Sequence, residues 1–432
     1  MLSKHLRRRS WRSTRLLHLE ALETRCVLST YTVTDLGTLG GAESYAFGLN
    51  NAGQVVGRAQ VANRHLHPFV WDNGVMTDLD PDGVPNGFAD PAAGAINEAG
   101  QIVGSAFVPY RAALWQDGQV IDLGTLGGQH SAAGSINNAS QIAGDSDLSG
   151  GGVHAIIWQD GAITDLGTLP GGGNFTFAAG INESGQVAGT VATADRSFHA
   201  AWWQQNIGWT DLGTLPNDPQ SEAHGINNLG HIVGFSGDED VAGAVQAFFY
   251  NGTTMIPAGP AGSFPYGIND SDQVVGSMIV AFPAVQHAYI YANGVVTDLN
   301  DLIPPDSGVT LEAATAINNN GQIVGYTSSL GVNPKPHAFL LTPDQGTAAR
   351  RIDPAVLAVA APRPITIADV THGSPANASL ERAPVETGAL PRVNATLPQA
   401  VDAVFAMHYR PEGLARPDEW LTTIDLDGAA LL

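Results

Sequence analysis

Residues 78–86, Asp-Leu-Asp-Pro-Asp-Gly-Val-Pro-Asn, carry oxygen atoms at alternate positions around a glycine. Such a pattern can wrap a hard cation, because carboxylate, amide and carbonyl oxygens are the ligands that Ca²⁺ prefers and the glycine permits a sharp turn. A solvated turn without a metal is the alternative. The cofactor expected here is therefore Ca²⁺, and its candidate ligands are four side chains and one carbonyl: Asp78, Asp80, Asp82, Asn86 and Val84.

Other polar residues recur along the chain at matched positions. A residue type that appears in every repeat usually serves the repeat, so histidines satisfied in the core and structural aspartates are expected, rather than a ring of metal ligands or a set of ligand-binding acids. The recurring residues are His67, His154, His199, His287 and His337, and Asp35, Asp78, Asp122, Asp165, Asp211 and Asp298. Two further acidic segments, Asp145-Ser-Asp147 and Asp238-Glu239-Asp240, are expected to be exposed loop charge.

One repeated position varies strongly in size. It lies two residues before each Ile or Leu of the Ile-Asn motif, and its occupants are Phe47, Gly94, Gly134, Ala179, His224, Tyr266 and Thr315. Variation at a fixed position is how a repeat protein can encode specificity, so Phe47, His224 and Tyr266 are predicted to form a ligand-facing cluster; filling between unequal repeats is the alternative. The sequence has no G-x-S-x-G, P-loop or H-E-x-x-H motif, so we expect that it is not an enzyme.

These residues belong to a sevenfold repeat. Ile-Asn or Leu-Asn, a turn, and a Gln-Val-Val-Gly-like strand recur at intervals of 40 to 49 residues, the length of one four-stranded propeller blade. Each unit contains four short segments rich in Val, Ile, Thr and aromatic residues, bounded by Gly, Asn or Asp, as strands are. The asparagines of the motif are Asn50, Asn97, Asn137, Asn182, Asn227, Asn269 and Asn318.

The ends of the repeat predict how it closes. The chain enters with a fourth-type strand, residues 31–36, and the repeat ends with a third-type strand, residues 337–341, so each lacks a partner nearby. Pairing the two would seal the ring and leave no unpaired edge at the junction. The predicted fold is therefore all-β: a seven-bladed β-propeller over residues 31–343, whose N-terminal strand completes the last blade.

The motifs His-Ala-x-x-Trp, Asp-Leu-Gly-Thr-Leu and Gly-Ile-Asn-x-x-Gly-Gln-Val-Val-Gly together resemble the HAF-repeat family of predicted extracellular bacterial proteins. The resemblance covers residues 31–343, although the literal triplet occurs only at residues 337–339 and Arg111 and Gln246 replace the His in two repeats. The resemblance implies a repeat fold and an extracellular location. It implies no activity.

The flanking segments differ in composition from the repeat. Residues 1–30 are basic and end in a pattern similar to the export segments of some large bacterial surface proteins; a leader without an address function is the alternative. Residues 344–432 are rich in Ala and Pro, as a mostly disordered linker and tail would be, with a short amphipathic helix possible at 399–409. No apolar stretch is long enough to predict a membrane span.

The charge of the chain limits its partners. Beyond residue 30 the chain carries 12 basic against 39 acidic residues, and the net charge of the whole is −22, which disfavours binding to nucleic acid. The function expected from the sequence is an exported or cell-surface binding scaffold for an extracellular protein or glycan. A glycan-active hydrolase or lyase on a propeller, or a purely structural surface spacer, are the alternatives.

Overall fold

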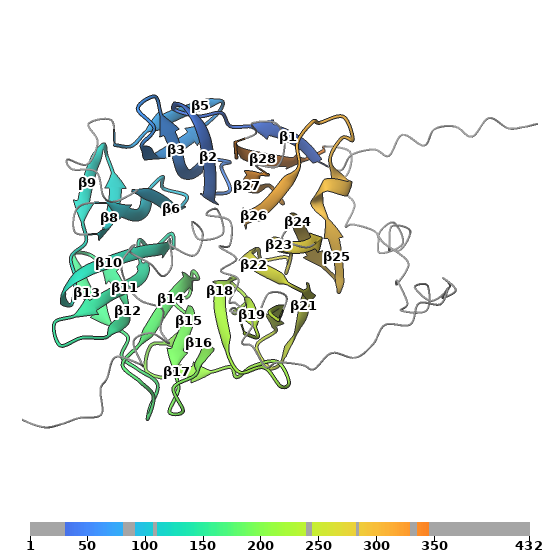
Figure 1. Ribbon diagram of the computed structural model, residues 1–432. Helices are drawn as coiled ribbons and strands as arrows, with labels where there is room; N and C mark the ends of the chain where they lie inside the picture. Colours follow the sequence, from blue (N-terminus) through green and yellow to red (C-terminus); the bar gives the residue numbers. More distant parts are fainter. Residues whose placement is uncertain are drawn as a thin grey trace, which may run out of the picture.

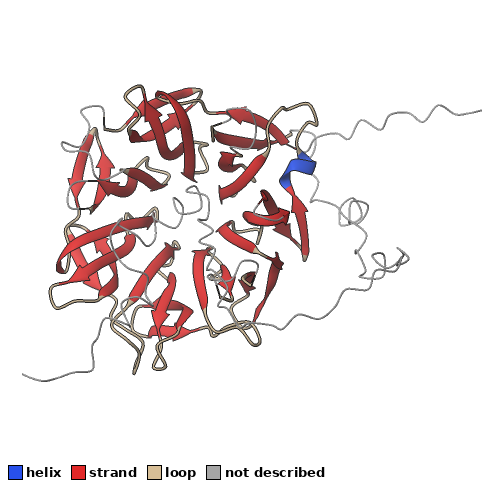
Figure 2. Cartoon of the chain, viewed as in Figure 1, coloured by secondary structure: helices blue, strands red, loops and turns tan. Residues whose placement is uncertain are grey.

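The computed structural model describes residues 31–80, 91–106, 110–238, 244–281, 285–328 and 335–344. Within them the chain forms seven four-stranded antiparallel sheets arranged around a central channel (Figure 1), with strands in every sector of the ring (Figure 2). This confirms the predicted seven-bladed β-propeller. Residues 1–30 and 345–432, including the helix predicted at 399–409, lie outside the described residues. Among the described residues, no helix has the length and apolar character to cross a membrane.

In blades 1 to 6 the strand order along the chain is also the order from the channel outwards (Figure 1). Blade 1 contains β2 (Gly40–Leu49), β3 (Val55–Val61), β4 (Leu66–Asp72) and β5 (Val75–Asp78). Blade 2 contains β6 (Ala92–Ile96), β7 (Ile102–Ala106), β8 (Arg111–Gln116) and β9 (Gln119–Asp122). Blade 3 contains β10 (Gly127–Ile136), β11 (Ile142–Leu148), β12 (Val153–Gln159) and β13 (Ala162–Asp165).

The other blades follow the same plan. Blade 4 contains β14 (Thr176–Ile181), β15 (Val187–Ala192), β16 (Phe198–Gln204) and β17 (Gly208–Asp211). Blade 5 contains β18 (Ser221–Ile226), β19 (Ile232–Ser236), β20 (Gln246–Tyr250) and β21 (Met255–Ala261). Blade 6 contains β22 (Ser263–Ile268), β23 (Val274–Ala281), β24 (Val285–Ala292) and β25 (Val295–Asp298), followed by the 3₁₀ helix η1 (Leu299–Leu302).

Blade 7 joins the two ends of the repeat. It consists of β26 (Leu311–Ile317), β27 (Ile323–Thr327), β28 (Ala338–Pro343) and, as its outermost strand, β1 (Tyr31–Asp35). β1 and β28 run antiparallel, with Tyr31 opposite Pro343 and Asp35 opposite Phe339. The side chain of Tyr31 is buried in the core of this blade. The predicted closure of the ring by the N-terminal strand is therefore confirmed.

The hydrophobic core lies between neighbouring blades. One cluster, for example, joins Val233 and Phe249 of blade 5 to Val274 and Tyr289 of blade 6. Similar clusters of buried side chains span the other junctions that the structure describes. Because each blade covers the apolar face of the next, the ring shares one continuous core.

The asparagine of the repeat connects each blade to the next. The Asn137 Oδ1 accepts hydrogen bonds from the backbone N–H groups of Ala139 and Gln141, which shapes the hairpin turn, while its Nδ2 donates to the backbone carbonyl of Asn182 in the following blade at 3.1 Å. The same bond from one asparagine to the next is made at all seven junctions, including that from Asn318 back to Asn50. These seven buried residues form a closed inner amide ring.

A second ring follows one residue later in the chain, at the turn. Its members are linked from blade to blade by side-chain to backbone hydrogen bonds, and amides alternate with carboxylates: Asn51, Glu98, Asn138, Glu183, Asn228, Asp270 and Asn319. We call this the outer polar ring. Because the number of members is odd, Asn319 and Asn51 are adjacent at the junction between blades 7 and 1.

The innermost strand of every blade contains a β-bulge at the same place. In blade 1 the register shifts between Ala46 and Gly48, so Phe47 is the extra residue; the other blades shift at the equivalent pair. The bulge presses the carbonyl of Tyr45 toward Gly57 on the next strand, where a Cβ would lie 2.0 Å from that oxygen. Only glycine fits this position, which explains the glycine that ends the Gln-Val-Val-Gly motif.

Candidate binding site in the central channel

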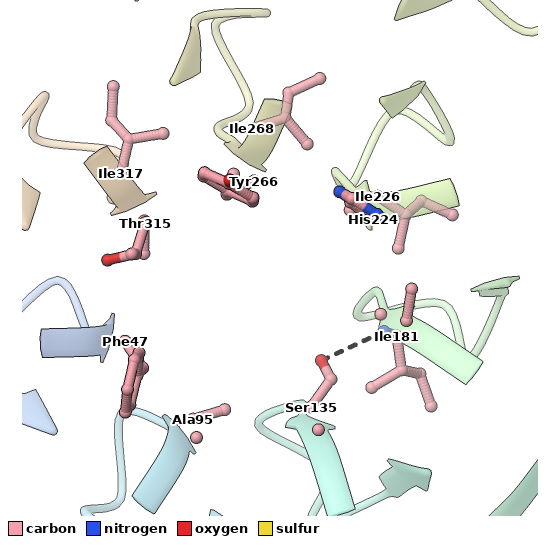
Figure 3. A pocket seen from close by; sticks show the side chains of 18 of the residues that line it. Phe47, Ala95, Ser135, Ile181, His224, Ile226, Tyr266, Ile268, Thr315 and Ile317 are labelled. Atoms are coloured by element: carbon pink, nitrogen blue, oxygen red, sulfur yellow. Dashed lines mark hydrogen bonds between the residues drawn. The ribbon is translucent and has the colours of Figure 1, made fainter. Parts of the chain in front are cut away.

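The described residues enclose a cavity of about 230 Å³ in the channel. The inner strands of all seven blades contribute to its wall, as Figure 3 shows from close by. The lining includes the seven bulged residues, which are the variable set of the repeat: Phe47, Gly94, Gly134, Ala179, His224, Tyr266 and Thr315. A bulge changes the direction of the side chain of the extra residue. The same bulge therefore directs the residue at the variable position toward the channel in all seven blades.

The three residues predicted as a cluster all line this cavity, and two of them touch. The rings of His224 and Tyr266 are almost parallel, with an interplanar angle of 6° and centroids 6.1 Å apart. In Figure 3 they lie side by side along one wall, and Phe47 stands at another part of the wall. We call the His224–Tyr266 pair the aromatic platform. Whether the three residues face a ligand stays a prediction.

Fixed contacts hold the aromatic platform in place. The Nδ1 of His224 lies 2.8 Å from the carbonyl oxygen of Pro265 and donates to it, which fixes that ring nitrogen as N–H. The edge of His224 also packs against Phe235, with centroids 5.3 Å apart. The Tyr266 hydroxyl pairs with Ser277 Oγ at 3.2 Å. Burial raises the pKa of Tyr266 to about 12, so its phenol is neutral at ordinary pH.

The Arg58 side chain lies over the rings of both Phe47 and Tyr45. The Arg58 guanidinium carbon lies 5.3 Å from the centroid of the Tyr45 ring and 5.9 Å from that of Phe47, within the range of a cation–π interaction. Phe47 and Tyr45 also belong to one buried cluster with Tyr266 and Tyr326. The aromatic part of the wall thus comes from blades 1, 5 and 6, and the bulged residues of blades 2, 3 and 4 are small.

The chemistry available in the cavity is limited. Among the described lining residues, Glu222 is the only carboxylate and His224 the only imidazole. The hydroxyl of Thr315 donates to the carbonyl of Ala46 at 2.9 Å, and that of Ser135 accepts from the N–H of Ile181 at 3.2 Å. The described wall therefore offers ring faces and apolar surface, and its hydroxyls are already used between blades.

The repeated His and Asp side chains form ion pairs within the blades, a pairing that the sequence analysis missed. The Nδ1 of His154, for instance, lies 2.8 Å from Asp165 Oδ1. In blade 2 Arg111 replaces the histidine and still reaches Asp122 at 3.0 Å. Each of these aspartates also accepts a backbone N–H two residues on, as predicted. The equivalent histidine pairs join His67 to Asp78, His199 to Asp211, His287 to Asp298 and His337 to Asp35.

The pair of His199 and Asp211 makes stability depend on pH. The hydrogen bond with Asp211 raises the pKa of His199, which stabilises the fold below the unfolded pKa of about 6.5; this contribution is lost as the pH rises through the raised pKa. Burial raises the pKa of Asp211, but hydrogen bonds from His199 and the Gly213 N–H outweigh burial and lower it. Its contribution is present above about pH 4 and is lost as the pH falls through the lowered pKa.

We therefore expect His199→Gln to lower the melting temperature more at pH 5.5 than at pH 8.5. Thermal unfolding of the wild type, His199→Gln, Asp211→Asn and the double variant at both pH values gives the coupling between the two side chains. The coupling should be larger at pH 5.5. Equal coupling at the two pH values would contradict this explanation.

The structure places only part of the predicted calcium loop. Asp78 Oδ2 lies 2.9 Å from His67 Nδ1 and Oδ1 accepts the N–H of Asp80, so Asp78 has the same structural role as the other repeated aspartates. Asp82, Val84 and Asn86 lie outside the described residues. Among the residues that are described, no group of three or more His, Cys, Asp or Glu side chains is placed to hold a metal. Calcium binding stays a prediction.

Calcium binding at this loop has a direct test. If the loop holds Ca²⁺, millimolar Ca²⁺ should raise the melting temperature, and Asp80→Ala should remove the rise. Asp117→Ala, in an exposed hairpin of blade 2, serves as the control and should keep it. Identical melting curves in Ca²⁺ and in chelator would end the hypothesis.

One of the acidic segments differs from expectation. Asp145 was expected to be exposed loop charge, but it lies on β11 and its side chain is buried. Burial raises the pKa of Asp145 well above its usual value, and a hydrogen bond from the Ala178 N–H at 2.7 Å opposes this shift. The expectation was wrong because the sequence around Asp145 does not distinguish a strand residue that faces the neighbouring blade from a residue of an exposed loop. Glu239 and Asp240 lie outside the described residues.

Comparison with known proteins gives no family for this chain. No family model and no curated protein match the chain. Similar solved structures include TolB from Acinetobacter baumannii, with 12% identity over 60% of this chain and 62% of TolB and a TM-score of 0.40. The WD40 β-propeller domain of Doa1 is 14% identical over 73% of this chain and 98% of that domain, with a TM-score of 0.43.

A streptogramin B lyase is 10% identical over 73% of this chain and 98% of the lyase, with a TM-score of 0.39. The chain thus spans less than two thirds of TolB. At such identities the comparisons concern the fold alone. By the order of its own sheets, the chain is a seven-bladed β-propeller.

Proposed function

We propose that this propeller is an exported binding scaffold that holds its ligand in the central channel. The observation that carries the proposal is the sevenfold bulge: the residue at the position that varies from Gly to Tyr lines the cavity in every blade. Other residues of the repeat have structural contacts: the inner amide ring joins each blade to the next, and the His–Asp pairs join two strands within a blade. Structure and specificity are thus assigned to different residues of the same repeat.

Export and the class of partner rest on the sequence. The basic leader and the resemblance to the HAF-repeat family support an extracellular or cell-surface location, and the acidic character of the chain supports a protein or glycan partner in preference to a nucleic acid. Cell fractionation with an antibody against the propeller tests the location. Recovery of the full-length chain from the cytoplasm alone would contradict it.

The main alternative is a glycan-active hydrolase or lyase. Glycoside hydrolysis generally needs two carboxyl groups about 5–10 Å apart on either side of the scissile bond. In the described part of the cavity wall only Glu222 supplies one. This count supports a binding module over a hydrolase at this site. A structural spacer, the other alternative, gives no reason for seven channel-facing bulges.

A retention assay distinguishes the three functions. The full chain is incubated with immobilised glycans, cell-wall polymers and extracellular protein extracts, and bound protein and released products are measured separately. A binding scaffold is retained without releasing products, and a variant that fills the channel, Ala179→Phe, should lose retention. Product release would support the enzyme. Retention that is indifferent to the channel variant, or no retention at all, would contradict the proposed function.

A further inference from the structure

We infer that the group held in the channel is a single neutral aromatic ring, from a small molecule or from a partner's side chain, stacked on the aromatic platform. This inference rests on the proposed function, because it names the ligand class for the same cavity. It is carried by four features of the described wall: the parallel rings, the size of the space, the committed hydroxyls and the position of Arg58.

The platform offers a stacking surface of two rings. The planes of His224 and Tyr266 are within 6° of each other, and the two rings lie side by side on one wall (Figure 3). Aromatic rings prefer offset stacked or edge-on contacts, and a ring placed over the boundary between the two would be offset from both. Phe47, elsewhere on the wall, supplies a further apolar contact.

The volume of the cavity suits a group of about one ring. An apolar cavity of about 150 Å³ accommodates benzene. A volume of about 230 Å³ therefore suits one ring with small substituents, or a fused pair such as indole. The space exists because the bulged residues of blades 2, 3 and 4 are Gly94, Gly134 and Ala179, which leave the part of the wall away from the platform thin.

The polar groups of the wall disfavour a sugar. A buried sugar needs a partner for each of its hydroxyls, because an unpaired polar group is costly to bury. The hydroxyls of Thr315, Ser135 and Tyr266 are all engaged in hydrogen bonds within the protein. An unsubstituted aromatic ring has no hydroxyl groups and needs no such hydrogen-bond partners.

Arg58 disfavours a cation. Its guanidinium already lies over the rings of Tyr45 and Phe47, so a second positive charge beside Phe47 would be repelled, which opposes the attraction of a cation to Glu222 and to the net charge of the chain. An anion would meet the Glu222 side chain and the net negative charge of the chain, −22. A neutral ring avoids both conflicts.

The test is a titration of the full chain with small probes of each class. Indole and p-cresol represent the free ring, N-acetyltryptophanamide a side chain, glucose and cellobiose the sugars, and tetramethylammonium the cation. Calorimetry or ligand-observed NMR measures binding. We expect the aromatic probes to bind and the others not to; if N-acetyltryptophanamide binds as tightly as indole, the channel admits a side chain, and if only indole and p-cresol bind, it takes free small molecules.

Two variants locate the binding. Ala179→Phe places a phenyl ring at a bulge where blades 1 and 6 already carry Phe47 and Tyr266, so the backbone position accepts an aromatic residue, and it should weaken aromatic binding at least tenfold. Gly150→Phe, in an exposed turn with nothing within 4 Å of the added Cβ, is the control and should leave binding unchanged. Thermal melting verifies that both variants fold; if Ala179→Phe does not, His224→Leu, which removes half of the platform, takes its place and should weaken binding severalfold.

The outcomes separate this inference from the proposed function. Sugar or tetramethylammonium binding that is lost in Ala179→Phe would overturn the aromatic ligand and keep the channel as the binding site. Aromatic binding that neither Ala179→Phe nor His224→Leu weakens would place the ring elsewhere and overturn the inference. The same follows if no aromatic probe binds, and the retention assay then decides whether the channel binds anything.

Discussion

A chain that begins at residue 37 is expected to unfold under conditions where a chain that begins at residue 31 is stable. The missing strand β1 supplies the outer partner of β28 along the pairs from Tyr31–Pro343 to Asp35–Phe339, and Tyr31 and Leu36 are each 5% exposed. Burying each large apolar side chain contributes about 1.5–3 kcal/mol, and the strand's hydrogen bonds add to this. The loss is of the order of 5 kcal/mol or more, comparable to the whole stability of many domains.

Chemical denaturation of the two chains measures this loss. Point variants refine it: Tyr31→Ala should cost about 2–4 kcal/mol because it empties a packed site, whereas Thr32→Ala, on the exposed side of the same strand, should cost less than about 1 kcal/mol. If both chains unfold at the same denaturant concentration, β1 does not close the ring and the propeller described here is wrong.

Replacing Asn137 with Ala should destabilise the propeller by about 3 kcal/mol or more. Asn137 is 2% exposed; its Nδ2 donates to the Asn182 carbonyl and to Gln141 Oε1, and its Oδ1 accepts two backbone N–H groups. Alanine leaves those two N–H groups without their partner and leaves the Asn182 carbonyl with a single hydrogen bond, from the Gly185 N–H. Each buried polar group left unpaired costs about 1–3 kcal/mol.

The next residue provides a matched control. Asn138 belongs to the outer polar ring, and its side chain is exposed, so water can replace the bonds it makes to Glu183 and Glu98. Asn138→Ala should cost less than about 1 kcal/mol. Denaturant midpoints of the two variants give the comparison. Similar losses at both positions would show that the inner amide ring has no special role in holding the blades.

The architecture could be predicted from the sequence because the motif of one blade recurs seven times. Seven copies of one motif fixed the number of blades, and the unpaired segments at residues 31–36 and 337–341 fixed the closure. Hairpin turns were predictable for the same reason: Ser140 and Asp272, which replace the turn glycine in two repeats, adopt positive φ values of 61° and 57° as that glycine does.

Features that depend on the alignment of two strands could not be predicted in this way. A bulge is a mismatch of one residue between neighbouring strands, so the orientation of Phe47 and the need for glycine at position 57 appear only once the register is known. The His–Asp pairs did leave a signal. Arg111 precedes Asp122 by the same 11 residues that separate His154 from Asp165, and a substitution that preserves both charge and spacing indicates a pair.

The candidate site was predicted only as a set of positions. The sequence placed Phe47, His224 and Tyr266 at equivalent points of the repeat, and the structure shows that all three line one cavity. It could not give the parallel arrangement of the His224 and Tyr266 rings, which depends on the angle between two blades. Nor could it give the size of the cavity, which depends on how closely seven inner strands approach the axis.

The odd number of members in the outer polar ring makes the seven blades non-interchangeable. Carboxylates sit on blades 2, 4 and 6, each between two amides that donate to it or accept from it, and the single amide-to-amide neighbour pair falls where blade 7 meets blade 1. Exchanging two neighbouring blades among blades 2 to 6 would bring two negative charges together, whereas joining the ends elsewhere would leave every neighbour unchanged. Because the number of blades is odd, one junction of this nearly symmetrical ring differs from the other six. It is the junction between blades 7 and 1, where the two ends of the repeat must meet during folding.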